Sequence, residues 1–239
     1  MRTAGKVVAQ VLKALEDAAK PGATTADLDE LAAKIIRGAG GRASFLHYEV
    51  SEKVYPAHIC TSINEEVVHG IPGPRTLRTG DIVGVDVGVF LNGFHADSAA
   101  TFAVGQVAPD TQRLLDATQG ALAAGVSAAR AGRRVGHISH AVQRYAESRG
   151  FHVVKALVGH GVGRQLHEEP NVPNFGQVTD GEKLQVGMTL AVEPMLSIGT
   201  HEVVGLEDDW TIMTADGSLS AHFEHTIAIT RDGADILTL

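Results

Sequence analysis

The stretch DIVGVDVGVFLNGFHADSAAT, residues 81–101, decides the fold because it specifies the register of two long strands. Asn92 and Gly93 lie between two apolar runs, and both residues tolerate the positive φ that a tight two-residue turn demands. The turn pairs Leu91 with Phe94 and so fixes every later pair. The sequence therefore predicts an antiparallel hairpin.

Two carboxylates share one face of this predicted hairpin. In the register set by the turn, Asp86 and Asp97 are diagonal neighbours, with Cα atoms roughly 7–8 Å apart. Two carboxylates at that separation can share a cation, and Gly88, opposite Asp97, is expected to leave the space between them free. The alternative is a solvated hairpin with two exposed aspartates.

Composition describes an ordinary globular chain and excludes some classes of function. The 239 residues are 44% hydrophobic and 20% charged, with a formal net charge of −8. That charge argues against a general binder of nucleic acid or of anionic membranes. A single cysteine, Cys60, excludes an internal disulfide and suits a reducing compartment. No signal peptide or membrane span is recognisable, so we expect a cytoplasmic protein.

Four amphipathic segments are predicted to be helices. Apolar residues recur at helical spacing through residues 3–19, and Lys20-Pro21-Gly22 ends that pattern. Thr25 is expected to cap a second helix over residues 26–37. Two further helices are predicted over about 110–130 and 135–149.

An internal repeat relates the two parts of the chain. A shift of 110 residues places Gly22 on Gly132 and Gly40 on Gly150. The repeat predicts two related halves, about 1–107 and 108–239, each with two helices followed by strands. No low-complexity linker separates them, so we expect one compact domain.

The second half carries three more polar residues in strand-like surroundings. His160 lies between glycines in ALVGHGVG, where the backbone is expected to approach a ligand closely. Glu193 follows an apolar run and precedes Pro194. Glu224 lies in an alternating segment, residues 221–230, predicted to be one strand. A glutamate in such a run is either at a surface edge or ligated, because burying a bare charge costs several kcal/mol.

Taken together, these positions offer four carboxylates and one imidazole. Hard oxygen ligands with a single nitrogen suit Mn²⁺, Fe²⁺, Co²⁺ or Zn²⁺, and two ions can share bridging carboxylates. Four negative charges also balance two divalent ions. The candidate metal ligands are Asp86, Asp97, His160, Glu193 and Glu224. Spacing alone does not show that such dispersed residues converge.

Five ordered motifs resemble the type I methionine aminopeptidases. They are NEEVVHGIPG (64–73), GDIVGVDVGVFLNGFHADSAATF (80–102), GHGVGRQLHEEP (159–170), VEPM (192–195) and FEHTIAIT (223–230). The resemblance runs over essentially the whole chain. It implies an α+β pita-bread fold, in which two pseudo-symmetric halves form a curved, mainly antiparallel sheet backed by helices.

The resemblance also implies how two divalent metal ions are bound. Asp86 is expected to chelate one ion, and Asp97 and Glu224 to bridge both. His160 and Glu193 are then expected to complete the other. The identity of the ions, cobalt, manganese, iron or zinc, stays open, because these ligands accept several of them.

The implied reaction is hydrolysis of the peptide bond after an N-terminal methionine, with a small second residue. Glu193 is the candidate to take the proton of the attacking water. His69 is expected to position the substrate amide and support proton delivery to the leaving amine. His167 is expected to hydrogen-bond the carbonyl oxygen or the tetrahedral intermediate.

The resemblance assigns Tyr55, Cys60 and Trp210 to an apolar pocket for the methionine side chain. Without it, Cys60 is simply a small buried hydrophobe and Trp210 a core anchor. Two departures from the family pattern affect this pocket. Leu166 replaces a family aromatic, and the segment from Tyr48 to Tyr55 is longer than usual.

The implied substrates are the N-termini of nascent polypeptides, met at the ribosome, and no nucleic acid or membrane partner is expected. We expect a monomer. The alternatives are an Xaa-Pro aminopeptidase or prolidase, which carries an additional N-terminal domain, and a type II methionine aminopeptidase, which carries an insertion in its C-terminal half. A catalytically silent relative acting as a binding protein is a further alternative. Neither HExxH nor GxSxG occurs.

Overall fold

A computed structural model describes all 239 residues, in four helices and seventeen strands. The helices are α1 (Arg2–Ala18), α2 (Thr25–Gly38), α3 (Pro109–Ala128) and α4 (Val135–Glu147). Every strand pair is antiparallel. This content confirms the expected α+β class with mainly antiparallel sheets.

The hairpin of β6 (Ile82–Leu91) and β7 (Phe94–Ala103) is the longest strand pair in the molecule. Leu91 pairs with Phe94 and Gly88 with Asp97, as the turn predicts. Asn92 and Gly93 have φ values of 54° and 83°. The other edge of β6 pairs with β4 (Cys60–Ile63) and β1 (Arg42–Ala43). The predicted register is therefore confirmed.

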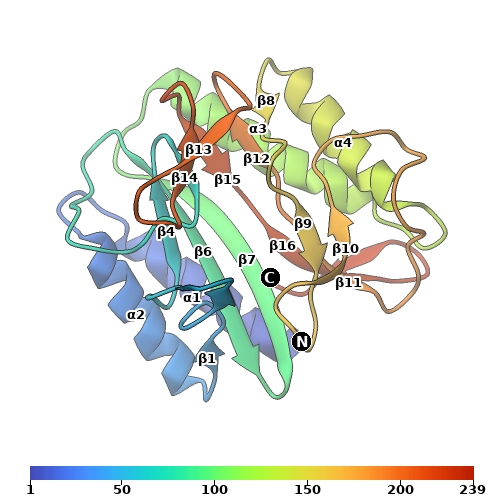
Figure 1. The fold of residues 1–239 in the computed structure, drawn as a ribbon, viewed down its shortest axis with the longest axis horizontal. Coiled ribbons are helices and arrows are strands. Elements are labelled where there is room, and N and C mark those ends of the chain that lie inside the picture. Colours follow the sequence, from blue (N-terminus) through green and yellow to red (C-terminus); the bar gives the residue numbers. More distant parts are fainter.

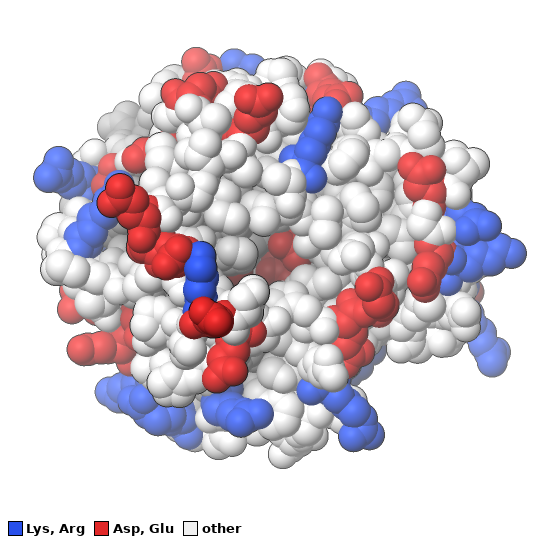
Figure 2. Space-filling view, viewed as in Figure 1, with Lys and Arg blue, Asp and Glu red and all other residues white.

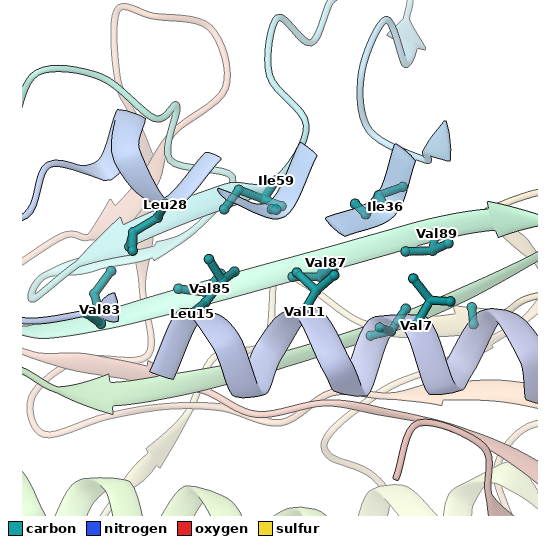
Figure 3. Close-up of a cluster of buried hydrophobic side chains, with 14 of the residues drawn as sticks. Val7, Val11, Leu15, Leu28, Ile36, Ile59, Val83, Val85, Val87 and Val89 are labelled. Atoms are coloured by element: carbon teal, nitrogen blue, oxygen red, sulfur yellow. The ribbon is translucent and has the colours of Figure 1, made fainter. Parts of the chain in front are cut away.

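Helix α1 covers one face of this hairpin and determines which way the aspartates point. Val83, Val85, Val87 and Val89 alternate along β6 and pack against the apolar side of α1 (Figure 3). All four valines are fully buried. Since successive side chains of a strand point to opposite faces, Asp86 points away from α1.

Eight strands of the second half form two sheets beside α3 and α4 (Figure 1). The larger sheet has the order β10-β9-β11-β16-β17 and the smaller one the order β15-β12-β8. The bounds of these strands are β8 (His152–Val153), β9 (Gly159–Gly161), β10 (Glu168–Val172), β11 (Thr189–Val192), β12 (Met195–Ser197), β15 (Ser220–His222), β16 (His225–Ile229) and β17 (Ala234–Ile236).

A further small sheet, β13-β14-β5, joins the two halves, because β5 belongs to the first half and β13 and β14 to the second. A separate hairpin, β2-β3, precedes β4. The bounds of these strands are β2 (Glu49–Val50), β3 (Lys53–Val54), β5 (Glu66–Val68), β13 (Val203–Gly205) and β14 (Ile212–Thr214).

The halves repeat each other down to individual hydrogen bonds. Gly22 and Gly132, both with positive φ, donate their N–H groups to the carbonyls of Leu77 and Leu184, at 2.9 and 2.8 Å. Gly80 and Gly187 likewise have positive φ, 97° and 94°, and they donate to the carbonyls of Val104, directly after β7, and Ile229, at the end of β16. Shared backbone contacts confirm the two-fold pseudo-symmetry that the weak sequence repeat predicted.

Two local expectations about the helices were wrong. Thr24, and not Thr25, caps α2: its hydroxyl accepts from the Asp27 N–H, while the Asp27 carboxylate accepts from the Thr24 N–H. This reciprocal pair needs the acid three residues after the cap, which only Thr24 provides. Helices α3 and α4 also end two residues earlier than predicted, at Ala128 and Glu147.

None of the four helices combines the length and the apolar character that a membrane crossing requires.

Candidate metal centre and active site

One cavity of about 550 Å³ opens where the two halves meet. Figure 2 shows a hollow near the centre of the face drawn, with acidic side chains at its floor. The structure brings all ten candidate metal, catalytic and substrate-binding residues to this cavity. They are Tyr55, Cys60, His69, Asp86, Asp97, His160, His167, Glu193, Trp210 and Glu224.

Three of these residues form the most compact group of possible ligands. Asp97, His160 and Glu224 each offer an atom within 4.8 Å of the other two. Their exposed fractions are 3%, 8% and 2%. Asp86 and Glu193 lie beside this group, and Glu193 Oε1 is 3.5 Å from His160 Nε2. This donor set could hold a metal ion.

The carboxylates lack the partners that buried anions need. Asp86 Oδ1, Asp97 Oδ1 and Glu224 Oε1 are buried and have no hydrogen-bond partner. Burial, and then the neighbouring carboxylates, raise the pKa values of Asp86, Glu193 and Glu224 well above the usual range. Burial also raises the pKa of Asp97 to about 7. A bound cation would satisfy these orphaned oxygens, so the residues present fit a divalent metal ion.

The backbone carbonyl of the next residue orients the His160 ring. Its Nδ1–H donates to the Gly161 carbonyl at 2.8 Å. Because a carbonyl oxygen only accepts, the proton of the neutral ring is on Nδ1, and Nε2 presents a lone pair. That lone pair is on the side of Glu193. Such a hydrogen bond behind a histidine is the usual support for a metal ligand.

Two glycine expectations were wrong. A Cβ atom on Gly88 would lie 2.7 Å from Ser44 Cβ and 3.3 Å from the Phe45 ring. Gly88 therefore admits the Ser44–Phe45 segment, and does not leave open space for a cation. A Cβ on Gly159 or Gly161 would similarly meet a backbone oxygen at 2.3 Å. The glycines beside His160 admit neighbouring strands, not a ligand.

The single strand expected over residues 221–230 was also wrong. The structure has two strands, β15 and β16, and Phe223 and Glu224 fall in the break between them. The Glu224 N–H donates to the Ala99 carbonyl of β7 at 2.8 Å. This break turns the Glu224 side chain into the cavity, and the alternating sequence pattern does not reveal it.

Side-chain hydroxyls join β7 to this broken segment. Thr226 Oγ1 accepts from the Asp97 N–H at 2.9 Å and donates to the Asp97 carbonyl at 2.7 Å. Thr101 Oγ1 makes the same double contact with His222, and Ser98 Oγ donates to the Glu224 carbonyl. We call Ser98, Thr101 and Thr226 the hydroxyl seam. It sets the position of Asp97 relative to Glu224.

Two histidines face the cavity from opposite halves. His69 follows β5 and has a φ of 62°, a left-handed conformation that is costly for a residue with a side chain. Burial lowers its pKa. His167 precedes β10, and its ring lies 4.3 Å from that of His160, measured between centroids. Desolvation, followed by the nearby His160 and His69 rings, lowers the pKa of His167.

An apolar wall closes one end of the cavity. Phe45, Tyr55, Cys60 and Leu166 are buried in one cluster, and Trp210 packs against it. The Tyr55 and Trp210 rings meet edge to face, with centroids 5.1 Å apart. Tyr55 Oη lies 2.9 Å from the Gly70 carbonyl oxygen and 3.1 Å from that of Ile59, so its one hydrogen has an acceptor. Leu166 contributes to the cluster but not to the cavity lining.

Several residues at the site were missed. Phe45 and Met195 line the cavity, and buried His222 places Nε2 3.8 Å from Glu193 Oε2. The hydroxyl seam was missed as well, because threonine in a strand is a common residue. The one available signal was the presence of threonines on otherwise apolar strands, in TFAVG (101–105) and AHFEHT (221–226).

Comparisons with known proteins agree with this geometry. The model of the family "Metallopeptidase family M24" matches residues 1–231. A methionine aminopeptidase of Clostridium acetobutylicum is 50% identical over 240 residues, covering 100% of this chain and 94% of its own length. Methionine aminopeptidase 1 of Bacillus subtilis is 47% identical, with the same coverage.

Solved structures show the same fold. The crystal structure of methionine aminopeptidase from Thermotoga maritima superposes with a TM-score of 0.97 at 44% identity, covering 100% of this chain and 94% of that one. The prolidase from Pyrococcus furiosus has a TM-score of 0.75 at 19% identity, and this chain covers 62% of it. That likeness concerns the fold alone.

These relatives confirm the resemblance to methionine aminopeptidases, and the architecture is the pita-bread fold. The chain belongs to metallopeptidase family M24.

Proposed function

We propose that this protein is a methionine aminopeptidase that hydrolyses the first peptide bond of chains beginning with methionine and a small second residue. One observation carries the proposal. Four carboxylates and one imidazole from both halves converge on one cavity, with three buried carboxylate oxygens left without partners. The full-length relatives that bear the name methionine aminopeptidase support the same activity.

The finer assignment of the metal ligands is part of the proposal. Two divalent ions, of cobalt, manganese, iron or zinc, would be held by the five candidate ligands of the cavity. When bound, they supply the acidification of the attacking water and the polarisation of the scissile carbonyl. The ligands are Asp86, Asp97, His160, Glu193 and Glu224.

The chain's own groups supply the remaining chemistry. Glu193 takes the proton of the attacking water, since its carboxylate lines the cavity beside the other candidate ligands. His167 donates a hydrogen bond to the carbonyl oxygen as negative charge develops there. His69 holds the substrate amide and passes a proton to the leaving amine.

The apolar wall selects the first residue. Tyr55, Cys60 and Trp210 enclose space for an unbranched apolar side chain. Burial raises the pKa of the Cys60 thiol well above its usual value, so this group is a neutral wall of the pocket and not a nucleophile. Shape must do the sorting, because one methylene is worth only about 1–3 kcal/mol.

The physiological setting follows from this activity. The substrates are nascent polypeptide N-termini presented at the ribosome, and the enzyme acts as a monomer in one domain. Its free, buried Cys60 suits the reducing cytoplasm.

The test is to strip metals and add back Mn²⁺, Co²⁺, Fe²⁺ or Zn²⁺ singly, with Met-Ala-Ser and Ala-Pro peptides as substrates. We expect metal-dependent release of methionine and no cleavage of Ala-Pro. Asp97→Asn should abolish the activity. Asp110→Asn is the matched control, since Asp110 is exposed at the start of α3. No methionine release with any ion would refute the proposal, and preferential cleavage before proline would favour a prolidase.

A further inference from the structure

Tyr48 contacts His167 across the mouth of the cavity. The phenol oxygen lies 2.6 Å from His167 Nδ1, and the ring centroids are 5.2 Å apart. Tyr48 comes from the first half and His167 from the second. The contact therefore joins the two halves at the histidine that faces the substrate carbonyl in the proposed reaction.

The hydrogen bond between these two groups can run in two directions, and each direction fixes a different tautomer of His167. A phenol carries one hydrogen, and Tyr48 Oη has no hydrogen-bond partner other than His167. If Nδ1–H donates to the phenol, Nε2 presents a lone pair to the cavity, and the phenol hydrogen is left to solvent at this exposed contact. If the phenol donates, Nδ1 accepts, which is the direction that the proposed reaction needs. In the neutral ring the proton is then on Nε2, the nitrogen on the far side from Tyr48.

A small hairpin holds Tyr48 in place. Tyr48 donates its N–H to the Phe45 carbonyl and accepts from the Tyr55 N–H at its own carbonyl, at 2.8 and 2.9 Å. Between these two tyrosines, β2 pairs with β3. These two backbone hydrogen bonds, at the base of the hairpin, join it to Phe45 and Tyr55, which are buried in the apolar wall of the cavity.

The tip of the hairpin is fastened to the opposite rim. Lys53 Nζ lies 2.6 Å from Asp209 Oδ1 and 3.4 Å from the Asp209 carbonyl oxygen. Asp209 precedes Trp210 and has a φ of 69°. The extra residues between Tyr48 and Tyr55 thus form a strap over the mouth, and Val50 on this strap lines the cavity. Val50 is otherwise exposed.

We propose that Tyr48 is a positioning residue that fixes His167 as the Nε2–H tautomer, and that the strap of residues 49–54 holds Tyr48 for this purpose. The Nε2–H is thereby presented to the cavity as the donor that the proposed reaction requires at the carbonyl oxygen. This role rests on the proposed function, whereas the tautomer itself is a property of the chain alone.

The direct test is the tautomer of His167 in the full-length protein, measured by ¹⁵N NMR of the histidine rings at pH 8. The Zn²⁺-loaded and metal-free forms are both measured, and His167→Gln identifies the signal among the 12 histidines. We expect the Nε2–H form in the wild type and a changed Nδ1 shift in Tyr48→Phe. Tyr145→Phe, on α4, removes an equal hydroxyl elsewhere and should leave the signal unchanged.

The kinetic test separates positioning from simple contact with substrate. In Tyr48→Phe, kcat should fall about five- to tenfold, as for the loss of one hydrogen bond, while KM and metal content stay within twofold. Lys53→Met, which releases the strap, should shift the same NMR signal by less. If Tyr48→Phe does not fold, the His167 tautomer of the wild type and the NMR signal of Lys53→Met still test the inference.

An Nδ1–H tautomer in the wild type would overturn the inference. A raised KM with unchanged kcat in Tyr48→Phe would also overturn it, because Tyr48 would then be only a wall of the pocket. If the Nε2–H form is found but no methionine is released with any metal, the proposed function fails and the tautomer assignment stands.

Discussion

The two halves of the molecule supply the side chains of the proposed metal site in different ways. The first half places Asp86 and Asp97 on two continuous ten-residue strands joined by one tight turn. The second half places His160 on a three-residue strand, Glu193 directly after β11, and Glu224 in the break between two strands. One pair depends on a local turn, and the other three residues depend on contacts distant in sequence.

This difference shows where the precision of the site originates. The register of β6 and β7 follows from the turn, so the alignment of the aspartates needs no contact with the second half. Glu224 gains its position from the hydroxyl seam, which spans more than 120 residues of sequence. We therefore expect the site to be least tolerant of change where the two halves join.

The largest expected effect on metal binding and activity follows the loss of a single carboxylate, tested separately in each half. Asp97→Asn and Glu224→Gln keep the side-chain volume and remove one negative charge each. Both should lose bound metal and activity by more than the roughly 10–100-fold that follows loss of a group behind a ligand. Metal analysis and peptide hydrolysis measure the two losses together.

The comparison between these two variants tests whether the halves contribute equally. Each should also be at least as stable as the wild type without metal, because a buried carboxylate with a raised pKa is replaced by a neutral amide. Retention of full metal content in either variant would show that the residue is not a ligand.

The two cavity histidines offer the next largest effect. His167→Ala should lower kcat by about 10²–10³, the usual consequence of removing one donor to a developing oxyanion, while metal content is kept. His69→Ala should lower kcat as well, and it should not relieve the left-handed backbone strain at that position, since alanine has a Cβ atom too. Equal loss of metal and turnover in His167→Ala would contradict the assigned role.

Breaking the hydroxyl seam should have an intermediate effect. Thr226→Val keeps the shape of the side chain and removes both hydrogen bonds to the Asp97 backbone. Metal affinity should fall roughly 10–100-fold, because Asp97 is no longer held against Glu224. The measurement is metal titration by calorimetry.

The matched control is Thr118→Val in α3. Thr118 is fully buried and donates to the Leu114 carbonyl within its own helix. This variant should cost stability without altering metal affinity. If both variants weaken metal binding equally, the seam acts only through general stability.

Sequence reasoning succeeded where structure is local and failed where it is tertiary. The register of Asp86 and Asp97 followed from Asn92-Gly93 because the turn is encoded by adjacent residues. The break at Glu224 could not be predicted, since the alternating segment satisfies the pattern of one strand while contacts with β7 interrupt it. Gly88 was misinterpreted for the same reason. The Ser44 side chain that packs against it lies 44 positions earlier in the sequence, so no local pattern reveals the contact.

The contact between Tyr48 and His167 is one of the tertiary features that the sequence does not predict. Its segment differs from the family pattern, so no motif places it, and the two residues meet only when the halves are assembled. In contrast, His69 and His167 lie within recognisable motifs, and the structure places both at the cavity. Motif matches locate groups, and packing determines how those groups are oriented.

Removal of metal should have a smaller effect, seen in stability, with a definite dependence on pH. Burial raises the Asp97 pKa from 3.8 to about 7 in the folded, metal-free chain. A carboxyl whose folded pKa is raised stabilises the fold fully below its unfolded pKa, and this stabilisation is lost as pH rises through about 7. The metal-free protein should therefore melt at lower temperature at pH 8 than at pH 5.

Bound metal should reverse this trend, because its ligands must be deprotonated. The difference in melting temperature between metal-loaded and chelator-treated protein should widen from pH 5 to pH 8. Asp97→Asn should flatten the metal-free profile. A gap that is constant across this range would mean that the cavity carboxylates do not govern it.

The smallest expected effect concerns the turn of the β6–β7 hairpin. Asn92→Ala places a residue with a Cβ and no local hydrogen-bonding group at a φ of 54°, which costs about 1 kcal/mol. For a chain of this size that lowers the melting temperature by roughly 2–4 °C. Activity and metal content should be unchanged, because ten paired positions and the packing against α1 still hold the register. A loss of metal in Asn92→Ala would show that the aspartates depend on their turn as closely as Glu224 depends on the seam.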